Sequence, residues 1–121
     1  MIRVMGAGAF GTALAVSLAK TGPVTLWCRD AEHAREMRKD RENARRLPGV
    51  TLPDEISIAT GDLPATDVDA TLLSVPMQKL RAFCDENQRL LGSGGPLVAC
   101  CKGIEVTSGK RPMQVIEDVL P

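Results

Sequence analysis

The sequence predicts an α/β fold in which helices cover both faces of a parallel sheet. Short apolar segments alternate with helical segments along the chain, which is the pattern of parallel strands joined by crossover helices. A turn containing Gly6, Gly8 and Gly11 stands directly between the first apolar segment and the first helical one. The length of 121 residues suits a single domain, and we see no internal repeat or second domain.

Five apolar segments are predicted to be strands. They are residues 2–5, 24–28, 56–59, 70–75 and 97–101. Four helices are predicted at residues 10–21, 30–46, 77–91 and 112–120. Prolines and glycines interrupt residues 47–55 and 92–96, so both segments are predicted to be loops.

The two helices of the first half differ in character. Residues 10–21 are rich in alanine and apolar almost all round, so we expect this helix to be buried, and a Gly-Pro pair ends it. Residues 30–46 are heavily charged and should form a solvent-facing helix with Asp30 as its N-cap. His33 and the charged run from Arg35 to Arg46 are therefore expected on the solvated surface.

The second half of the chain completes the sheet. Residues 56–59 are a weak strand that suits a sheet edge, whereas residues 70–75 and 97–101 are strongly apolar and should be buried strands. Apolar residues recur at helical spacing in residues 77–91 and 112–120, so each of these helices should pack one face inward.

Composition argues against several classes of partner. Fifteen basic and fifteen acidic residues balance, so bulk charge favours neither nucleic acid nor an anionic membrane. Aromatic residues are too scarce for a platform that stacks single-stranded nucleic acid. No apolar run approaches the roughly 20 residues that cross a bilayer, and we see no room for a signal peptide. We expect a cytoplasmic protein.

The four cysteines give no sign of a metal site. Cys28, Cys84, Cys100 and Cys101 form no C-x-x-C pair, and the single histidine has no cysteine at metal-ligand spacing. Cys100 and Cys101 are adjacent, so on a strand they should point to opposite faces. We expect buried, reduced thiols and no metal.

The three glycines have the G-x-G-x-x-G spacing of a dinucleotide-binding turn, and their position between a strand and a helix agrees with it. Gly6 would make the sharp turn, Gly8 would let a pyrophosphate approach the backbone, and Gly11 would let the helix pack closely on the sheet. The start of the helix would offer free N–H groups to the phosphates. The alternative is a tight turn into a buried helix. We favour a Rossmann-like, doubly wound sheet that binds a dinucleotide.

The residue that recognises the adenosine ribose is expected at the end of the second strand, at Arg29 or Asp30. A carboxylate there accepts from the 2′-hydroxyl of NAD, whereas a guanidinium pairs with the 2′-phosphate of NADP. Asp30 already serves as a helix N-cap. Arg29 is therefore the predicted contact and NADPH the predicted cofactor, with NADH and a solvated Arg29 as the alternatives.

Ligands of such sheets bind at the carboxyl ends of the strands. Two segments qualify: Ser74–Gln78, which includes Val75 and Pro76, and Cys100–Glu105. Lys102 is the charged group at the end of an apolar strand, where an ammonium would lie beside a nicotinamide ring and an anionic or carbonyl substrate. An ordinary loop lysine is the alternative.

Five segments together resemble the bacterial-type NAD(P)-dependent glycerol-3-phosphate dehydrogenases. They are Gly6–Ala15, Leu26–Asp30, Asn43–Pro53, Val75–Arg81 and Cys101–Glu105. The resemblance spans nearly the whole chain. It implies a cytoplasmic enzyme that reduces dihydroxyacetone phosphate to sn-glycerol 3-phosphate with NADPH or NADH, for phospholipid synthesis.

Residue by residue, the resemblance implies that Ala9, Phe10 and Arg29 contact the cofactor and that Lys102 is a catalytic residue touching cofactor and substrate. The sequence departs from the family at three positions. Ala9 stands where serine is frequent, Arg46 where an aromatic residue is usual, and Met77 where a small polar residue is common.

Family members carry a second, helical domain with the general-acid lysine and most phosphate-binding groups. Residues 1–121 resemble the N-terminal cofactor domain alone, so we expect cofactor binding with little or no turnover. The alternatives are a stand-alone redox-sensing module, which would not need Lys102, and the cofactor domain of another reductase such as ketopantoate reductase. An unpaired sheet edge can promote association, so a homodimer is one possible state.

Overall fold

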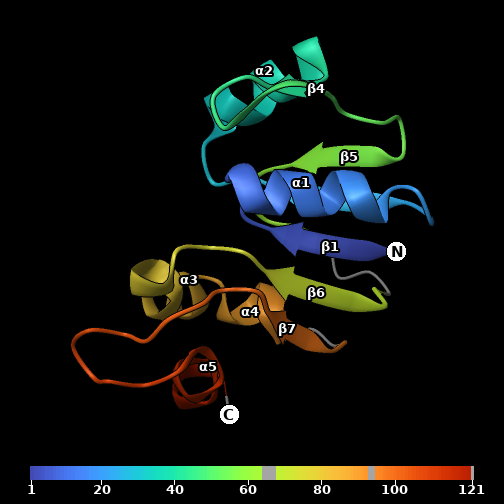
Figure 1. The fold of residues 1–121 in the computed structure, drawn as a ribbon. Coiled ribbons are helices and arrows are strands. Elements are labelled where there is room, and N and C mark those ends of the chain that lie inside the picture. The colour runs from blue at the N-terminus through green and yellow to red at the C-terminus, as the bar shows by residue number, and fades with distance from the viewer. Residues whose placement is uncertain (64–67, 93–94, 121) are drawn as a thin grey trace.

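Five parallel strands form one sheet in the computed structural model, which describes residues 1–63, 68–92 and 95–120. The strands are β1 (Ile2–Met5), β2 (Val24–Trp27), β5 (Ile56–Ala59), β6 (Ala70–Leu73) and β7 (Leu97–Ala99). Their order across the sheet is β5-β2-β1-β6-β7 (Figure 1). The chain therefore builds outward from β1 in one direction, and then returns to the other side of β1 to add β6 and β7. All five predicted strands are present, and β5 is an edge strand as expected. The expectation that the strand at residues 97–101 is buried is wrong, because β7 forms the other edge of the sheet and leaves Val98 exposed.

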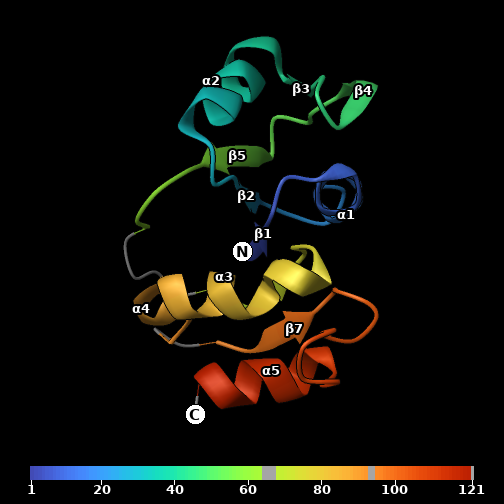
Figure 2. The same ribbon diagram turned by 90° about the vertical axis from the view of Figure 1, so that its left-hand side faces the viewer.

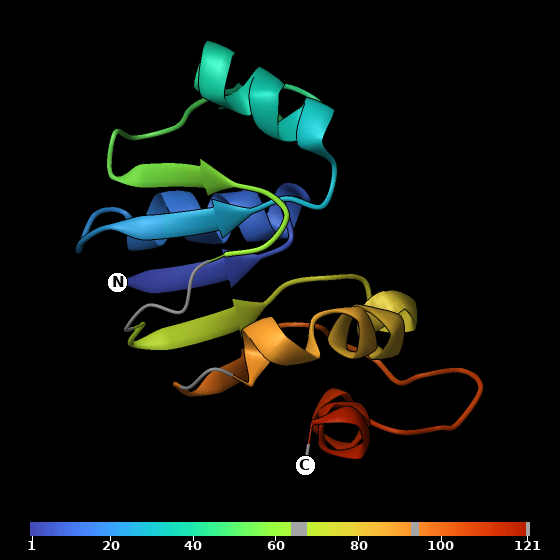
Figure 3. The same ribbon diagram turned by 180° about the vertical axis from the view of Figure 1, so that it is seen from behind.

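The sheet is covered on both faces because its side chains alternate. Val4 and Leu26 pack in one core with α1 (Ala9–Leu18) and α2 (Ala31–Asp40). Their chain neighbours Met5 and Trp27 point to the other face and join a second core. That second core includes side chains of η1 (Met77–Lys79), α3 (Leu80–Glu86), α4 (Gln88–Leu91) and α5 (Pro112–Val119). Figure 1 views the sheet from the α1 side and Figure 3 from the α3 side. The predicted doubly wound α/β fold is confirmed.

Helix α1 is buried on one side only, so the expectation of burial all round is wrong. Gly11, Thr12 and Ala15 are buried against the sheet, whereas Ala13 is exposed and the Phe10 side chain is 61% exposed. The helix lies on a single layer of sheet, so nothing in the described part of the chain covers its outer surface.

The helix predicted at 77–91 is interrupted at Asn87, between α3 and α4. The Asn87 side-chain amide donates to the Phe83 carbonyl oxygen at 2.8 Å, where it competes with the helical backbone.

Helix α2 is shorter than predicted because the chain reverses at Arg41. Asp30 caps the helix as expected, and accepts from the backbone N–H groups of Glu32 and His33. Arg41 lies in the left-handed region at φ 51°, and its guanidinium donates to the carbonyl oxygens of Pro53 and Ile56. The chain then forms an antiparallel hairpin of β3 (Glu42–Asn43) and β4 (Leu47–Thr51). The prediction of helix to residue 46 and loop from residue 47 is therefore wrong.

The buried side chain of Asn43 links this hairpin to the glycine turn. Its Nδ2 donates to the Ala7 carbonyl oxygen at 3.0 Å and to Thr12 Oγ1 at 2.7 Å. Its Oδ1 accepts from the Arg46 backbone N–H at 3.2 Å and lies 2.7 Å from His33 Nε2. One fully buried amide thus connects α1, α2, the hairpin and the loop between β1 and α1.

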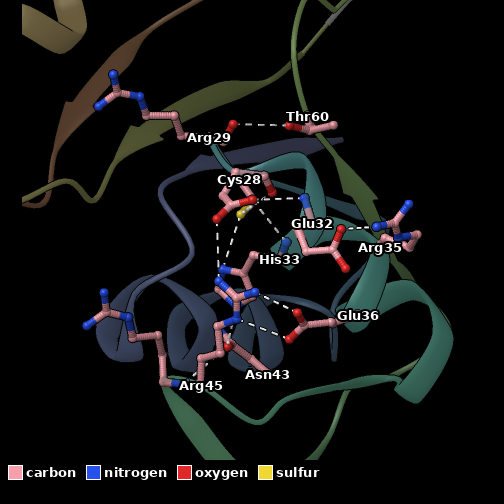
Figure 4. A network of polar contacts seen from close by, with 11 residues as sticks. Cys28, Arg29, Glu32, His33, Arg35, Glu36, Asn43, Arg45 and Thr60 are labelled. Carbon is pink, nitrogen blue, oxygen red and sulfur yellow. Dashed lines mark hydrogen bonds and ion pairs between the residues drawn. The ribbon is translucent and has the colours of Figure 1, made fainter.

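His33 is buried, so the expectation of a solvated histidine is wrong. Both donor hydrogens of the Asn43 amide are used elsewhere, so Oδ1 faces His33, whose Nε2 must carry the proton. His33 Nδ1 is then the acceptor, 3.3 Å from the Cys28 thiol (Figure 4). The hairpin, which the sequence did not predict, is what encloses the ring.

The segment after β7 is held against η1 and α3 by side chains. The Gln78 amide donates to the Ile104 carbonyl oxygen and accepts from the Val106 N–H. The Arg81 guanidinium donates to both carboxylate oxygens of Glu105 and to Asp118 on α5. These contacts fix the loop that carries Lys102.

We predict that Asn43→Ala lowers the free energy of unfolding by about 2–4 kcal/mol, because buried groups of Ala7, Thr12 and His33 lose their partner. Urea denaturation measures this. Gln88→Ala, which removes an exposed side chain whose one bond within the described residues goes to Asp85, should change stability by less than about 0.5 kcal/mol. Equal stability of the two variants would contradict the role given to Asn43.

We also predict acid sensitivity from the Arg81 cluster. The Arg81 guanidinium holds the pKa of Glu105 below its usual range, and Lys110 with Arg81 lowers the pKa of Asp118. The folded state therefore binds these protons less readily than the unfolded state, so stability should fall as pH drops below about 5. Glu105→Gln should lower the melting temperature at pH 7 and make its decline in acid shallower. Glu117→Gln, which removes an exposed carboxylate next to Asp118 on α5, should behave as wild type in a thermal melt.

Candidate functional site

Two neighbouring pockets lie at the carboxyl ends of the strands. Figure 2 views the sheet from these strand ends. The first, here called the β2 pocket, is about 380 Å³ and is bordered by the ends of β1 and β2, by η1 and by α3. The second, the β7 pocket, is about 460 Å³ and is bordered by the start of α1 and the end of β7. They share Gly8, Ser74, Val75 and Pro76. The shared wall lies between β1 and β6, where the direction of strand addition reverses and ligands of such sheets bind.

The glycine turn has the shape that a dinucleotide needs. Gly6 has φ +116°, and a Cβ there would lie 2.5 Å from the Ser74 carbonyl oxygen. A Cβ at Gly11 would lie 2.0 Å from the Gly6 carbonyl oxygen, so this glycine lets the helix approach the turn rather than the sheet surface. A Cβ at Gly8 would meet no described atom within 4 Å. Gly8 therefore keeps space open in front of the backbone, which is the fit expected for a bound pyrophosphate.

The start of α1 is available to an anion. Gly8 is the N-cap, and no side chain of the described residues caps the helix or places a carboxylate in its first turn. The N–H groups of Ala9 and Phe10 therefore have no helical acceptor, and both residues border the β7 pocket. Such a helix end favours phosphate through its free N–H groups and its dipole.

Arg29 and Asp30, at the end of β2, both line the β2 pocket but differ in availability. The Asp30 carboxylate accepts two backbone N–H bonds and pairs with Arg45 at 3.4 Å. The exposed Arg29 guanidinium has no hydrogen bond or ion pair within the described residues, since only its backbone carbonyl is engaged, by Thr60 (Figure 4). The carboxylate is thus committed to structure and the guanidinium is free.

The β7 pocket brings together the apolar ring of Phe10, the exposed ammonium of Lys102 and the thiols of Cys100 and Cys101. Cys28 and Cys84 are buried as predicted, whereas Cys100 and Cys101 are only half-buried because the strand ends before them. Burial raises the pKa of both pocket thiols, so they are protonated near neutral pH. Neither thiol is set up as a nucleophile.

Every residue predicted to contact cofactor borders one of the two pockets. They are Gly6, Gly8, Ala9, Phe10, Gly11, Arg29, Val75, Pro76 and Lys102. Arg29 lines only the β2 pocket and Lys102 only the β7 pocket, on either side of the shared wall. Sequence reasoning missed Arg46, which also lines the β2 pocket. The sequence did contain a sign of this role, because Arg46 is a basic residue at a position where the family that the sequence resembles usually has an aromatic one.

No group of three potential metal ligands occurs in residues 1–63, 68–92 and 95–120. No helix in the same part of the chain is both long and apolar enough to span a membrane.

Known proteins share this fold and sequence. The whole chain, residues 1–121, matches the family model described as NAD-dependent glycerol-3-phosphate dehydrogenase N-terminus. A glycerol-3-phosphate dehydrogenase of Ruegeria sp. (strain TM1040), named as using NAD(P)+, is 54% identical over 99% of this chain and 37% of the relative. One from Roseobacter denitrificans is 45% identical, with the same coverage.

Solved structures agree with these relatives. The crystal structure of glycerol-3-phosphate dehydrogenase from Coxiella burnetii has a TM-score of 0.86 and 30% identity, over 98% of this chain and 37% of that chain. This chain therefore spans well under half the length of the relatives that it matches. On this evidence it belongs to the NAD-dependent glycerol-3-phosphate dehydrogenase family, whose N-terminal part it matches along its whole length.

Proposed function

We propose that residues 1–121 are the cofactor-binding part of an enzyme that reduces dihydroxyacetone phosphate to sn-glycerol 3-phosphate with NADPH. The observation that carries the proposal is the pair of pockets joined across the glycine turn, with free Arg29 in one and Lys102 in the other. Two adjoining pockets separated by a phosphate-binding turn suit the two halves of a dinucleotide. The names of the matching relatives support the substrate.

The state of the two residues after β2 supports NADPH over NADH. A carboxylate that accepts from the ribose 2′-hydroxyl needs free lone pairs, and those of Asp30 serve the cap of α2 and Arg45. The unpaired guanidinium of Arg29 instead suits a 2′-phosphate, which accepts two parallel hydrogen bonds. We therefore assign the adenosine half to the β2 pocket.

The β7 pocket would then take the nicotinamide half. Phe10 offers an apolar ring, and Val75 and Pro76 form the wall shared with the other pocket. When bound, the reduced nicotinamide ring supplies the hydride that the ketone carbon accepts, while a proton goes to the ketone oxygen. The Lys102 ammonium would bind the substrate and stabilise the negative charge that develops on that oxygen. A module that only senses the cofactor would have no use for this lysine.

We place the general acid and most substrate phosphate contacts outside residues 1–121. The matching relatives are much longer, which leaves room for a second domain that completes the site. This chain alone is then expected to bind cofactor without measurable turnover, because the reacting groups are not held together. We further propose that the full enzyme is cytoplasmic and serves phospholipid synthesis. A homodimer remains an expectation, supported by the open edge of the sheet at β7.

Calorimetric titration with NADPH and NADH tests the cofactor assignment. Arg29→Gln should weaken NADPH binding about tenfold to a hundredfold, because a charged hydrogen bond is lost, and should leave NADH binding nearly unchanged. Arg35→Gln is the matched control, since Arg35 is exposed and pairs with Glu32 outside both pockets. Failure of the wild-type chain to bind either nucleotide would refute the proposed function.

Gly8→Ala separates folding from binding. The added Cβ would meet no described atom, so the melting temperature should change by only a few degrees. The same Cβ would occupy the space reserved for the pyrophosphate, so NADPH binding should weaken more than about tenfold. Unchanged NADPH affinity would place the phosphates elsewhere. Gly11→Ala gives the contrasting result, a loss of stability, because its Cβ would collide with the turn.

A further inference from the structure

We propose that Arg46 is a second specificity-determining residue, which binds the 2′-phosphate of NADPH together with Arg29. The inference rests on the proposed function and deepens it. Both arginines line the β2 pocket, but they come from different elements: Arg29 follows β2, and Arg46 lies in the turn between β3 and β4.

Arg46 stands out among the arginines of its own segment because its guanidinium has no partner within the described residues. The other four arginines between residues 35 and 46 are engaged. Arg35 pairs with Glu32, Arg38 donates to the Ile58 carbonyl oxygen, Arg41 donates to the Pro53 and Ile56 carbonyl oxygens, and Arg45 pairs with Glu36 and Asp30. The engaged arginines stabilise the local fold. Arg46 is left exposed at the pocket with its donors unused.

The backbone of Arg46 is nevertheless held in place relative to the glycine turn. Its N–H donates to the Asn43 carbonyl oxygen and to Asn43 Oδ1, each at 3.2 Å. The same Asn43 side chain donates to the Ala7 carbonyl oxygen, inside the turn. Arg46 is therefore anchored at its base to the loop that would hold the pyrophosphate, while its side chain is free to reach a ligand.

The charges around the β2 pocket favour a ligand with an extra anionic group. Its lining includes three cations, Arg29, Arg46 and Lys79, and two carboxylates, Asp30 and Glu86. The Asp30 carboxylate accepts two backbone N–H bonds and pairs with Arg45, which also pairs with Glu36. Arg29 and Arg46 both border this pocket with unused donors, and the 2′-phosphate dianion is the group of NADPH that can accept hydrogen bonds from both. NADH has no such group, so Arg46 should discriminate between the two nucleotides.

The test compares wild type, Arg46→Gln and Arg46→Lys with four probes: NADPH, NADH, 2′,5′-ADP and 5′-AMP. Trp27, the one tryptophan of the chain, lines the β2 pocket, so its fluorescence reports binding. Arg46→Gln should weaken NADPH and 2′,5′-ADP about tenfold or more, and change NADH and 5′-AMP by less than about twofold. Arg46→Lys should lie between, because it keeps the charge but loses the planar donor fork.

Each outcome is informative. Unchanged NADPH affinity in Arg46→Gln would overturn the proposal, and so would an equal loss for NADPH and NADH, which would place Arg46 on the shared adenosine or pyrophosphate. Wild-type binding of NADPH with no effect of Arg46→Gln leaves the proposed function standing. Absence of binding by the wild type overturns both. The Arg35→Gln variant controls for the loss of one surface charge, and a thermal melt checks that each variant is folded.

Discussion

The buried amide of Asn43 is the interaction on which the arrangement of this molecule depends. It makes four contacts at once, to the glycine turn, to α1, to His33 on α2 and to the hairpin backbone. A buried amide tolerates no loss of partners, so these four elements can adopt only one mutual arrangement without leaving polar groups unpaired. The rigidity of the turn is thus not a property of its glycines alone. It is supplied by a side chain more than thirty residues away in the sequence.

The strand order sets the position of the two pockets, and the glycine turn sets which chemical groups can bind there. Strand addition reverses between β1 and β6, so the loops that leave these two strands diverge and leave a gap at their carboxyl ends. At the base of this gap, Gly6 packs so closely against the Ser74 carbonyl oxygen that no side chain could replace its hydrogen without a clash. Two pockets open on either side, and the uncapped start of α1 faces an anion with its N–H groups and dipole. One geometric consequence of chain order therefore places two adjoining pockets and a free helix N-terminus at the same edge of the sheet.

Some charged side chains of this protein are bonded within the fold, whereas others border the pockets without a partner and can bind a ligand. Asp30, Arg38, Arg41, Arg45, Arg81 and Glu105 hold caps, turns and loops, and their donors and acceptors are used within the fold. Arg29, Arg46, Lys79 and Lys102 border the pockets and have no ion-pair partner among the described residues. The net charge of zero hides this division. An unpaired cation costs little in water but binds a phosphate strongly once water is excluded, so these four side chains are the ones available to select a ligand.

The sequence by itself determined the strand and helix alternation, the glycine turn, the Asp30 cap and those pocket residues that follow the strand ends, such as Arg29, Val75 and Lys102. These follow from local composition, because apolar runs, glycines before a helix and capping side chains act over a few neighbouring residues. The tertiary structure decided the rest. Charged composition predicted a long helix over residues 30–46, but Arg41 reverses the chain there by bonding to carbonyl groups beyond residue 52. The burial of His33, the four contacts of Asn43 and the position of Arg46 at the β2 pocket all depend on that reversal. They required the fold because each joins residues that local periodicity cannot connect.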